Sequence, residues 1–421
     1  MKFFLQLIAI LILQYSVFAE TPEKVLEDIN QIISEIPSST KMAIVIYNPL
    51  TQDTIISINH TESMIPASNT KLFTSAAALE LMGGEYQLLT KLLTDDVDIS
   101  DGTINGNIYI KGYGNAEFES EDLDSLTVFL SVSGIKKITG NVIGDDTYFD
   151  NVYSRDDWIN EEHANVKLPA ISALVIDRNR TTVTKKRKGR YRTYFVNVDN
   201  PPLFAAKKLN EKLDSYGIEV EGNATFGQTP DSAEVLAESS ILLRDLLKNV
   251  NKNSDNFLAE CLFKTIGAVY SGQQGNSFFS TQAILSFIRD NGIYSDGTQV
   301  VDGSGISRFD QVTAGALTGL LEKVYFNLSG FEDFYNSLSI AGVDGTLEDR
   351  MHGSLAENNF RGKTGTLNGV SSISGYLTTA DGDDLIVCIM FEFNKGGARI
   401  YRNIQDRIIE TLAGWENKSP E

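Results

Sequence analysis

Between Pro66 and Gly84 the sequence reads Pro-Ala-Ser68-Asn-Thr-Lys71-Leu-Phe-Thr-Ser-Ala-Ala-Ala-Leu-Glu-Leu-Met-Gly-Gly. The small and apolar residues after Lys71 favour a helix of about four turns, which the two glycines end. A helix places Ser68 and Lys71, three positions apart, on one face. Burial lowers the pKa of a lysine, so a neutral Lys71 amine could accept the proton of the Ser68 hydroxyl. The segment therefore predicts a serine nucleophile with a lysine base, near the positive end of a helix dipole.

Ser-x-x-Lys alone also occurs on many solvated helix surfaces, so further evidence is needed. Two further polar clusters in the second half of the chain supply it. Ser254-Asp-Asn256 opens a predicted helix over 254–270, and Lys363-Thr364-Gly365-Thr366 precedes a predicted strand that begins at Val370. Each has a structural explanation by itself, as a helix cap or as a glycine that frees the backbone beside a strand. Together and in this order, the three motifs resemble those of serine β-lactamases and penicillin-binding proteins.

The three clusters predict complementary chemical roles. Ser68 would attack a carbonyl and form an acyl-enzyme, while Lys71 takes its proton. Ser254 would relay that proton to the leaving amine, and Asn256 would hydrogen-bond Lys71 and the substrate amide. Lys363 would bind a carboxylate at the C-terminus of the substrate. The remaining predicted contacts are hydroxyl donors at Thr364 and Thr366 around Gly365, and an oxyanion hole made by the backbone N–H groups of Ser68 and Thr366.

The interval between Ser68 and Ser254 is much longer than a compact β-lactamase needs. In this respect the chain resembles the class C low-molecular-mass penicillin-binding proteins, the D-alanyl-D-alanine carboxypeptidase/endopeptidase family, over essentially its whole mature length. The resemblance implies an enzyme that acts on peptidoglycan stem peptides and is acylated by penicillin and other β-lactams. It also implies that Asp145 and Arg308 lie near the side chain of the substrate; the alternatives are a turn aspartate and a structural ion pair. Further matching segments are 140–149, 176–179, 301–308 and 341–350.

A predicted hairpin lies near each end of the chain, and a predicted helix follows each hairpin. The first hairpin covers 41–47 and 54–59, and the second covers 370–379 and 384–393. Strand-like apolar runs and short polar turns mark both of them. We therefore expect one antiparallel sheet assembled from the two ends of the sequence. Helical periodicity also predicts helices at 21–36, 123–133, 203–216, 241–250, 281–291, 313–325 and 397–413.

The expected fold class is α+β. A β-lactamase/transpeptidase-like domain, with its antiparallel sheet flanked by helices, would comprise 20–91 and 239–421. Short β-rich runs separated by Gly, Asn and Asp interrupt it. They predict a β-rich insertion of one or two small domains, at 92–170 and 171–238.

The composition limits the classes of partner. The chain has 421 residues, 42% of them hydrophobic, which is ordinary for a folded protein with a large core. Its net charge of −20 makes it a poor candidate for nucleic-acid binding and disfavours an anionic membrane surface. The dense basic run at 185–192 is either a solvated hairpin tip or a contact for an anionic cell-surface polymer.

The first residues resemble a secretory signal. A basic start at Lys2, an apolar run and Ala19 after small residues predict a signal peptide over 1–19. We expect an exported protein, periplasmic or extracellular, without a membrane span once the signal is removed. Cys261 and Cys388 lack metal-ligand spacing and fit burial as small hydrophobic residues. The three histidines are scattered, so neither a metal nor another cofactor is expected.

Other functions stay open at the level of sequence. A β-lactamase would need an additional carboxylate base, for which Glu260 is a weak candidate. A non-catalytic wall-binding or penicillin-sensing protein could share the fold, although its motifs would be expected to decay. A Ser-His-Asp hydrolase has little support, because no Gly-x-Ser-x-Gly motif occurs. The sequence does not predict the oligomeric state or the balance between carboxypeptidase, endopeptidase and transpeptidase activity.

Overall fold

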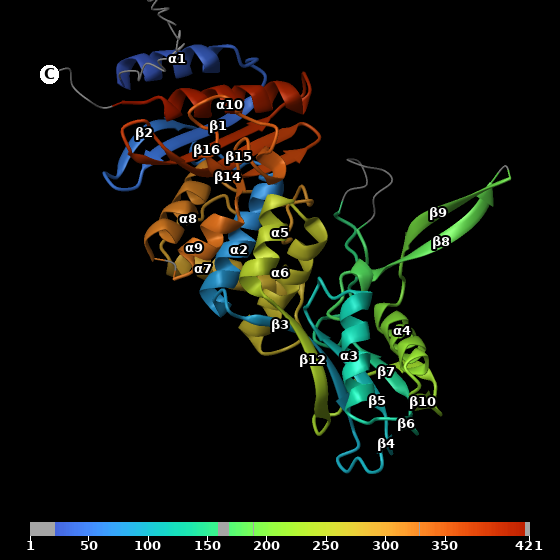
Figure 1. Cartoon of the computed structure of the whole chain (residues 1–421). Coiled ribbons are helices and arrows are strands. Elements are labelled where there is room, and N and C mark those ends of the chain that lie inside the picture. The colour runs from blue at the N-terminus through green and yellow to red at the C-terminus, as the bar shows by residue number, and fades with distance from the viewer. Residues whose placement is uncertain (1–21, 159–167, 188, 328, 417–421) are drawn as a thin grey trace, which may run out of the picture.

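The computed structural model describes residues 22–158, 168–187, 189–327 and 329–416 (Figure 1). The predicted signal peptide at 1–19 lies outside the described residues. Both ends of the chain meet in one layered unit, and the middle of the chain forms an insert at the other end of the molecule (Figure 1).

The central sheet is antiparallel and joins the two ends of the chain, as the sequence predicted. β1 (Lys41–Asn48) pairs with β2 (Asp53–Ile58) on one side and with β16 (Asp384–Glu392) on the other. Ile46 therefore lies opposite Val387, a residue from the far end of the sequence. Beyond β16 the order continues with β15 (Val370–Thr378), β14 (Arg361–Leu367) and β13 (Ser339–Ile340).

Helices cover both faces of this sheet, which explains the unbroken apolar run in β16. Val387 and Ile389 point to one face, and Ile386 and Cys388 point to the other, because side chains alternate along a strand. All four are fully buried. On the first face lie α1 (Pro22–Ser34) and α10 (Ala398–Ala413); on the second lie α2 (Thr70–Met82), α5 (Leu243–Lys252), α6 (Asn256–Ser271), α7 (Ser277–Asp290), α8 (Ala314–Asn327) and α9 (Phe331–Ser337).

The helix α2 is buried from Thr70 to Leu79. It packs against α5, α6, α7 and α8, so no side of this stretch faces solvent (Figure 1). This position accounts for a sequence that is small and apolar all round, without the single apolar stripe of a surface helix. Gly83, with a φ of 75°, ends the helix where the sequence predicted.

The insert has its own hydrophobic cluster. Leu92 and Ile110, from the first predicted inserted domain, pack in one cluster with Leu174 and Leu209, from the second. This shared core favours the alternative of a single insert, and the domain boundaries stay a prediction. The elements are β3 (Gln87–Thr94), β4 (Thr103–Ile104), β5 (Ile108–Tyr113), α3 (Ser120–Val132), β6 (Lys137–Ile138), β7 (Val142–Asp145), β8 (Arg180–Arg187), β9 (Arg190–Asn197), α4 (Pro201–Ser215), β10 (Glu219–Val220), β11 (Ala224–Phe226) and β12 (Glu234–Leu242).

The strands of the insert form separate sheets. One sheet has the order β11-β7-β5-β3-β12, a smaller one has the order β10-β6-β4, and β8 and β9 form a hairpin of their own.

Cys261 and Cys388, elsewhere in the molecule, are both buried and free, as small hydrophobic residues would be. Within the described residues, no helix combines the length and the apolar character that crossing a membrane requires.

Candidate active site

Ser68 lies in a tight turn that leads into α2. The sequence predicted one continuous helix, but the first turn, η1 (Ala67–Asn69), is 3₁₀ and the α-helix begins at Thr70. The cause is Ala67, whose φ of 49° is incompatible with an α-helix. A strained residue of this kind costs about 1–3 kcal/mol and persists only where its surroundings fix it. The surrounding structure therefore holds the half-buried Ser68 at the N-terminal end of α2.

Lys71 is fully buried one turn later, and its amine contacts three oxygen atoms. Its Nζ lies 3.0 Å from Ser68 Oγ, 2.6 Å from Asn256 Oδ1 and 2.6 Å from the carbonyl oxygen of Ser304. A neutral amine has two N–H bonds and one lone pair. Because Asn256 and Ser304 present acceptors, they take the two N–H bonds, and the lone pair faces the Ser68 hydroxyl.

The surroundings of Lys71 favour its neutral form. Burial lowers the pKa of Lys71 to about 8. A base with this pKa has an appreciable neutral fraction near neutral pH, as proton abstraction requires. Four carboxylates limit the shift because they stabilise the ammonium form; they belong to Asp302, Glu260, Asp255 and Asp310.

The second motif forms the turn between α5 and α6. The sequence favoured Ser254 or Asn256 as a cap, but the N-cap is Asp255, whose Oδ1 accepts a hydrogen bond from Leu258 N at 3.0 Å. Ser254 has a φ of 53°, which turns the chain sharply before the helix. Asn256 can thereby begin α6 with its side chain on Lys71. The structure thus brings the first two motifs together through Asn256.

The third motif lies on β14, directly beside the Ser68 turn. A Cβ atom at Gly365 would lie 2.7 Å from the carbonyl oxygen of Pro66 and 3.1 Å from the backbone N of Ser68. It would lie only 2.2 Å from Ser372 Oγ, which itself donates a hydrogen bond to Pro66 O at 2.7 Å. Close packing therefore requires a glycine at position 365, whether or not the backbone also needs the conformational freedom of glycine.

We expect Gly365→Ala to displace β14 from the Ser68 turn. Overpacking of this kind lowers the free energy of unfolding by about 1–3 kcal/mol, and acylation of Ser68 should slow because the oxyanion donors move apart. Denaturant unfolding and the time course of labelling by a fluorescent penicillin measure the two effects. Gly397→Ala is the matched control, because the space around Gly397 is open and its φ is −104°. Equal labelling rates for both variants would contradict the expectation.

Lys363 is fully buried on the same strand. Burial and, to a smaller degree, the charge of Lys71 lower the pKa of Lys363 well below its usual range. Its Nζ donates to the carbonyl oxygen of Thr364 at 2.9 Å, and Thr364 Oγ1 donates to Thr346 Oγ1 at 2.8 Å. Thr366 is exposed next to them. The predicted cation therefore depends on an incoming carboxylate to stabilise its charged form.

The carbonyl of Ser304 belongs to a closed loop over 300–310, which we call the Asp302 loop. Reciprocal backbone hydrogen bonds of 2.6 and 2.8 Å between Gln299 and Gln311 tie its ends together. Gly305 has a φ of 80°, and a Cβ there would lie 1.9 Å from the carbonyl oxygen of Ala67. The loop consequently packs on the strained turn that carries Ser68.

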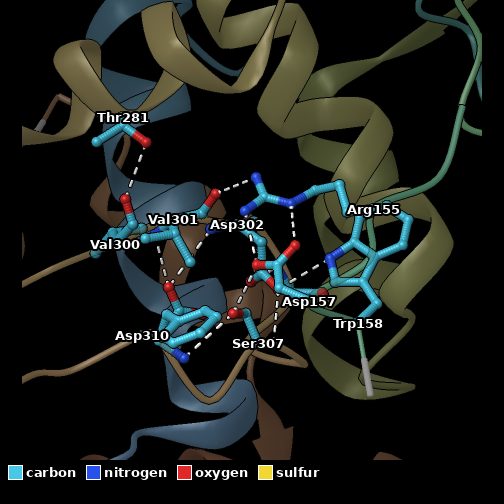
Figure 2. Close-up of polar contacts among 12 residues, drawn as sticks. Arg155, Asp157, Trp158, Thr281, Val300, Val301, Asp302, Ser307 and Asp310 are labelled. Carbon is cyan, nitrogen blue, oxygen red and sulfur yellow. Dashed lines mark hydrogen bonds and ion pairs between the residues drawn. The ribbon is translucent and has the colours of Figure 1, made fainter. Parts of the chain in front are cut away.

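Buried carboxylates organise the Asp302 loop from inside (Figure 2). Asp310 Oδ1 accepts from Val301 N at 2.7 Å, and Glu260 on α6 accepts from Ser304 N at 2.9 Å. Burial, followed by the charge of Asp302, raises the pKa of both Glu260 and Asp310. Asp302 itself accepts hydrogen bonds from the backbone N–H groups of Ser304, Gly305 and Ser307.

The sequence did not predict this buried shell. The 301–308 segment matched only as part of a family resemblance, which implied no role for Asp302, Ser304 or Asp310. Glu260 entered only as a candidate water-activating base. The density of glycines around Ser304 was the local signal that a backbone atom comes close to a catalytic group.

Arg308 and Asp145, the two residues predicted to lie near the substrate side chain, occupy different parts of the structure. Arg308 is half-buried, and its Nη2 donates to the carbonyl oxygen of Asn368 at 2.7 Å, at the turn that joins β14 to β15. Asp145 is fully buried in the insert, where it pairs with Lys111 at 3.1 Å. It also accepts hydrogen bonds from Thr147 and Thr229, which lower its pKa although burial opposes them. These partners agree with a turn aspartate; both substrate-binding roles stay predictions.

The fold is that of penicillin-binding proteins. The crystal structure of penicillin binding protein 4 from Haemophilus influenzae matches with a TM-score of 0.77 at 23% sequence identity, over 91% of this chain and 99% of that chain. A predatory peptidoglycan endopeptidase from Bdellovibrio bacteriovorus matches with a TM-score of 0.55 at 15% identity, over 90% and 94% of the two chains. The α+β fold expected from the sequence is therefore confirmed.

The chain belongs to the D-Ala-D-Ala carboxypeptidase 3 (S13) family, whose sequence pattern matches residues 25–195 and 186–415. A D-alanyl-D-alanine carboxypeptidase from Actinomadura sp. strain R39 is 29% identical over 94% of this chain and 86% of its own length. The D-alanyl-D-alanine carboxypeptidase DacB of Haemophilus influenzae is 26% identical over 85% of this chain and 86% of its own. The family resemblance found in the sequence is confirmed, and the chain is a serine peptidase by family.

Proposed function

We propose that the protein is an exported serine D-alanyl-D-alanine carboxypeptidase that also cleaves peptide cross-bridges of peptidoglycan. The observation that carries the proposal is the position of the Lys71 amine. Two acceptors take its N–H bonds, and its lone pair faces Ser68 Oγ, 3.0 Å away. Family membership supports the substrate class, since matched relatives are named D-alanyl-D-alanine carboxypeptidases. β-Lactams would acylate the same serine.

Ser68 and Lys71 carry the first step of the proposed reaction. Lys71 takes the hydroxyl proton as Ser68 Oγ attacks the carbonyl carbon of the peptide bond between the two D-alanines. The backbone N–H groups of Ser68 and Thr366 stabilise the oxyanion that forms. The C–N bond then breaks, the proton passes to the leaving amine through Ser254, and D-alanine departs. Water hydrolyses the acyl-enzyme and regenerates the Ser68 hydroxyl.

The motif on β14 gives the reaction its preference for a C-terminal carboxylate. A carboxylate that enters next to Lys363 restores its charged form, which burial otherwise disfavours. Thr364 and Thr366 supply hydroxyl donors to the same group, and Asn256 holds the substrate amide as well as Lys71. Near the Asn368 turn, Arg308 would contact the substrate side chain.

The burial of Glu260 favours a peptidase over a β-lactamase. Its Oε1 already accepts from the backbone N–H groups of Gly303 and Ser304, at 3.1 and 2.9 Å. Only 2% of the residue is exposed, so the carboxylate is poorly placed to activate a water on an acyl-enzyme. We therefore expect slow release of the penicilloyl group from Ser68.

Digestion of purified muropeptides, with the products identified by mass, tests the proposal. Loss of one D-alanine from pentapeptide muropeptides demonstrates carboxypeptidase activity, and conversion of cross-linked dimers to monomers demonstrates endopeptidase activity. Rapid and repeated hydrolysis of penicillin without muropeptide cleavage would support the β-lactamase instead. Covalent penicillin binding without turnover of either substrate would support a penicillin-sensing protein.

A further inference from the structure

A segment of the insert lies against the Asp302 loop. We call residues 150–158 the strap. Lys264 on α6 anchors its beginning, because its Nζ donates to Asp150 Oδ1 at 2.5 Å and to the carbonyl oxygen of Val152 at 2.7 Å. The carbonyl oxygen of Tyr153 accepts from Ile171 N at 2.9 Å, which ties the strap to the insert. The first half of the strap is therefore bound both to α6 and to the insert.

The other end of the strap makes side-chain contacts with the Asp302 loop (Figure 2). Arg155 Nη1 donates to the carbonyl oxygen of Val301 at 2.5 Å, and Trp158 Nε1 donates to Asp302 Oδ2 at 3.2 Å. Asp157 Oδ2 accepts from Ser307 Oγ at 2.8 Å. Within the strap, Arg155 and Asp157 form a bidentate pair of 2.9 and 2.8 Å, which fixes both side chains.

We propose that Arg155, Asp157 and Trp158 are positioning residues that hold the Asp302 loop closed over Lys71. The inference rests on the proposed function, because it concerns the lysine base. Trp158 holds Asp302, and Asp302 in turn accepts from Ser304 N at 3.1 Å. Ser304 presents its carbonyl oxygen to Lys71. The insert thereby helps to direct the lone pair of the base at Ser68.

Loosening the Asp302 loop should change both the orientation of the Lys71 amine and its pKa. A displacement of about 1 Å in a catalytic group lowers the rate by about 100-fold. Water that enters would relieve the burial that lowers the pKa of Lys71, so the pKa should rise toward its ordinary value. The titratable groups that face Lys71 are Asp302 and Asp310 from the loop, Asp255 and Glu260 from α6 and its N-cap, and Lys363 from β14.

The test compares the rate of penicillin acylation over a range of pH for wild type, Arg155→Met and Trp158→Phe. We expect both variants to acylate about 10- to 100-fold more slowly, with the rise of the rate moved to higher pH. Arg155→Lys, which keeps the charge, should recover part of the rate. Lys212→Met is the matched control, since it removes an ion pair of 2.7 Å with Asp124 elsewhere in the insert.

The outcomes separate this inference from the proposed function. Variants that melt at lower temperature but keep the wild-type pH profile would show that the strap only stabilises the fold, and would overturn the inference. Wild type that penicillin does not acylate would refute the proposed function, and the inference with it. An equal effect of Lys212→Met would also overturn the inference, because the effect would not be specific to the loop.

A different observation concerns the hairpin of β8 and β9, which projects from the insert (Figure 1). Lys185 lies opposite Arg192, and Arg187 lies opposite Arg190. The two pairs share one face because side chains alternate along a strand. Like charges directly opposite each other destabilise a sheet. The hairpin sequence over 180–197 contains no Asp or Glu that could neutralise them.

We infer that this four-cation face binds a phosphate-rich anionic polymer outside the cell. Arginine forks match phosphate groups, and a chain of phosphates satisfies several cations at once. A membrane fits less well, because the two most exposed aromatic rings, Tyr191 and Phe195, lie on the opposite face, and only the less exposed Tyr194 shares the face of the four cations. The net charge of −20 repels such a polymer elsewhere on the protein, while screening over about 8 Å isolates the hairpin tip from this repulsion.

Binding of labelled inorganic polyphosphate at increasing salt tests this inference. We expect affinity that falls with salt, and a loss of about tenfold or more when Lys185, Arg187, Arg190 and Arg192 are all changed to Thr. The control changes Arg180 and Lys186, on the opposite face, to Thr and should retain most of the affinity. Equal binding by both variants would overturn the inference. So would binding only to anionic phospholipid vesicles, or self-association that the fourfold variant abolishes.

Discussion

Ser68→Ala is expected to abolish covalent labelling by a fluorescent penicillin and to lower peptide turnover by about 10⁴-fold or more. The Ser68 Oγ is the atom to which the acyl group would bond, and it lies 3.0 Å from the amine that would take its proton. Alanine fits the 3₁₀ turn, so the variant should fold. Gel fluorescence after incubation with the penicillin, and mass analysis of digested muropeptides, measure the two losses.

The matched control for this experiment is Ser75→Ala, which removes the same hydroxyl group two turns further along α2. Ser75 Oγ accepts a hydrogen bond from Asn251 Nδ2 at 3.0 Å, and the Lys71 amine is not among the hydrogen-bond partners of the Ser75 hydroxyl in the described part of the chain. We expect a loss of about 1 kcal/mol of stability and unchanged labelling. Labelling that survives Ser68→Ala would show that another residue is the nucleophile.

The acylation rate of the wild-type protein should rise with pH up to about 8 and then level off. Lys71 must be neutral to accept the proton, and burial lowers its pKa to about 8. Below that value the neutral fraction falls tenfold for each pH unit, so the rate at pH 6 should be about 100-fold lower than at the plateau. Burial also lowers the pKa of Lys363, so loss of its proton as the pH rises should weaken binding of the substrate carboxylate. Stopped-flow acylation in buffers of constant ionic strength measures the profile.

Lys71→Arg removes this titration while it keeps a positive charge at the site. A guanidinium does not lose its proton at any pH of the assay, so the rate should fall by about 10²- to 10⁴-fold and lose its rise toward pH 8. Ser75→Ala should retain the wild-type profile. A flat profile for the wild type between pH 6 and 9 would contradict the role of Lys71 as a base with a lowered pKa.

The sequence predicted the parts of this protein that depend on local spacing and propensity. Strand-like apolar runs with polar turns near both ends predicted the sheet in which Ile46 lies opposite Val387. The set of three motifs, through its resemblance to penicillin-binding proteins, predicted the meeting of Lys71 with Asn256. Local rules failed at Ala67, where packing on Gly305 interrupts the continuous helix that the sequence predicted.

Only the tertiary structure decided what surrounds and aims the base. The sequence by itself determined a serine–lysine pair at the start of a buried helix, a sheet built from both chain ends and an insertion between them. It did not determine that Ser304 O holds Lys71, or that Arg155 contacts Val301 across 146 positions. Such contacts carry no periodicity or capping signal, because they arise where separate elements pack together. The pKa of Lys71 is likewise a property of the packed site, because removal of water from around the amine lowers it.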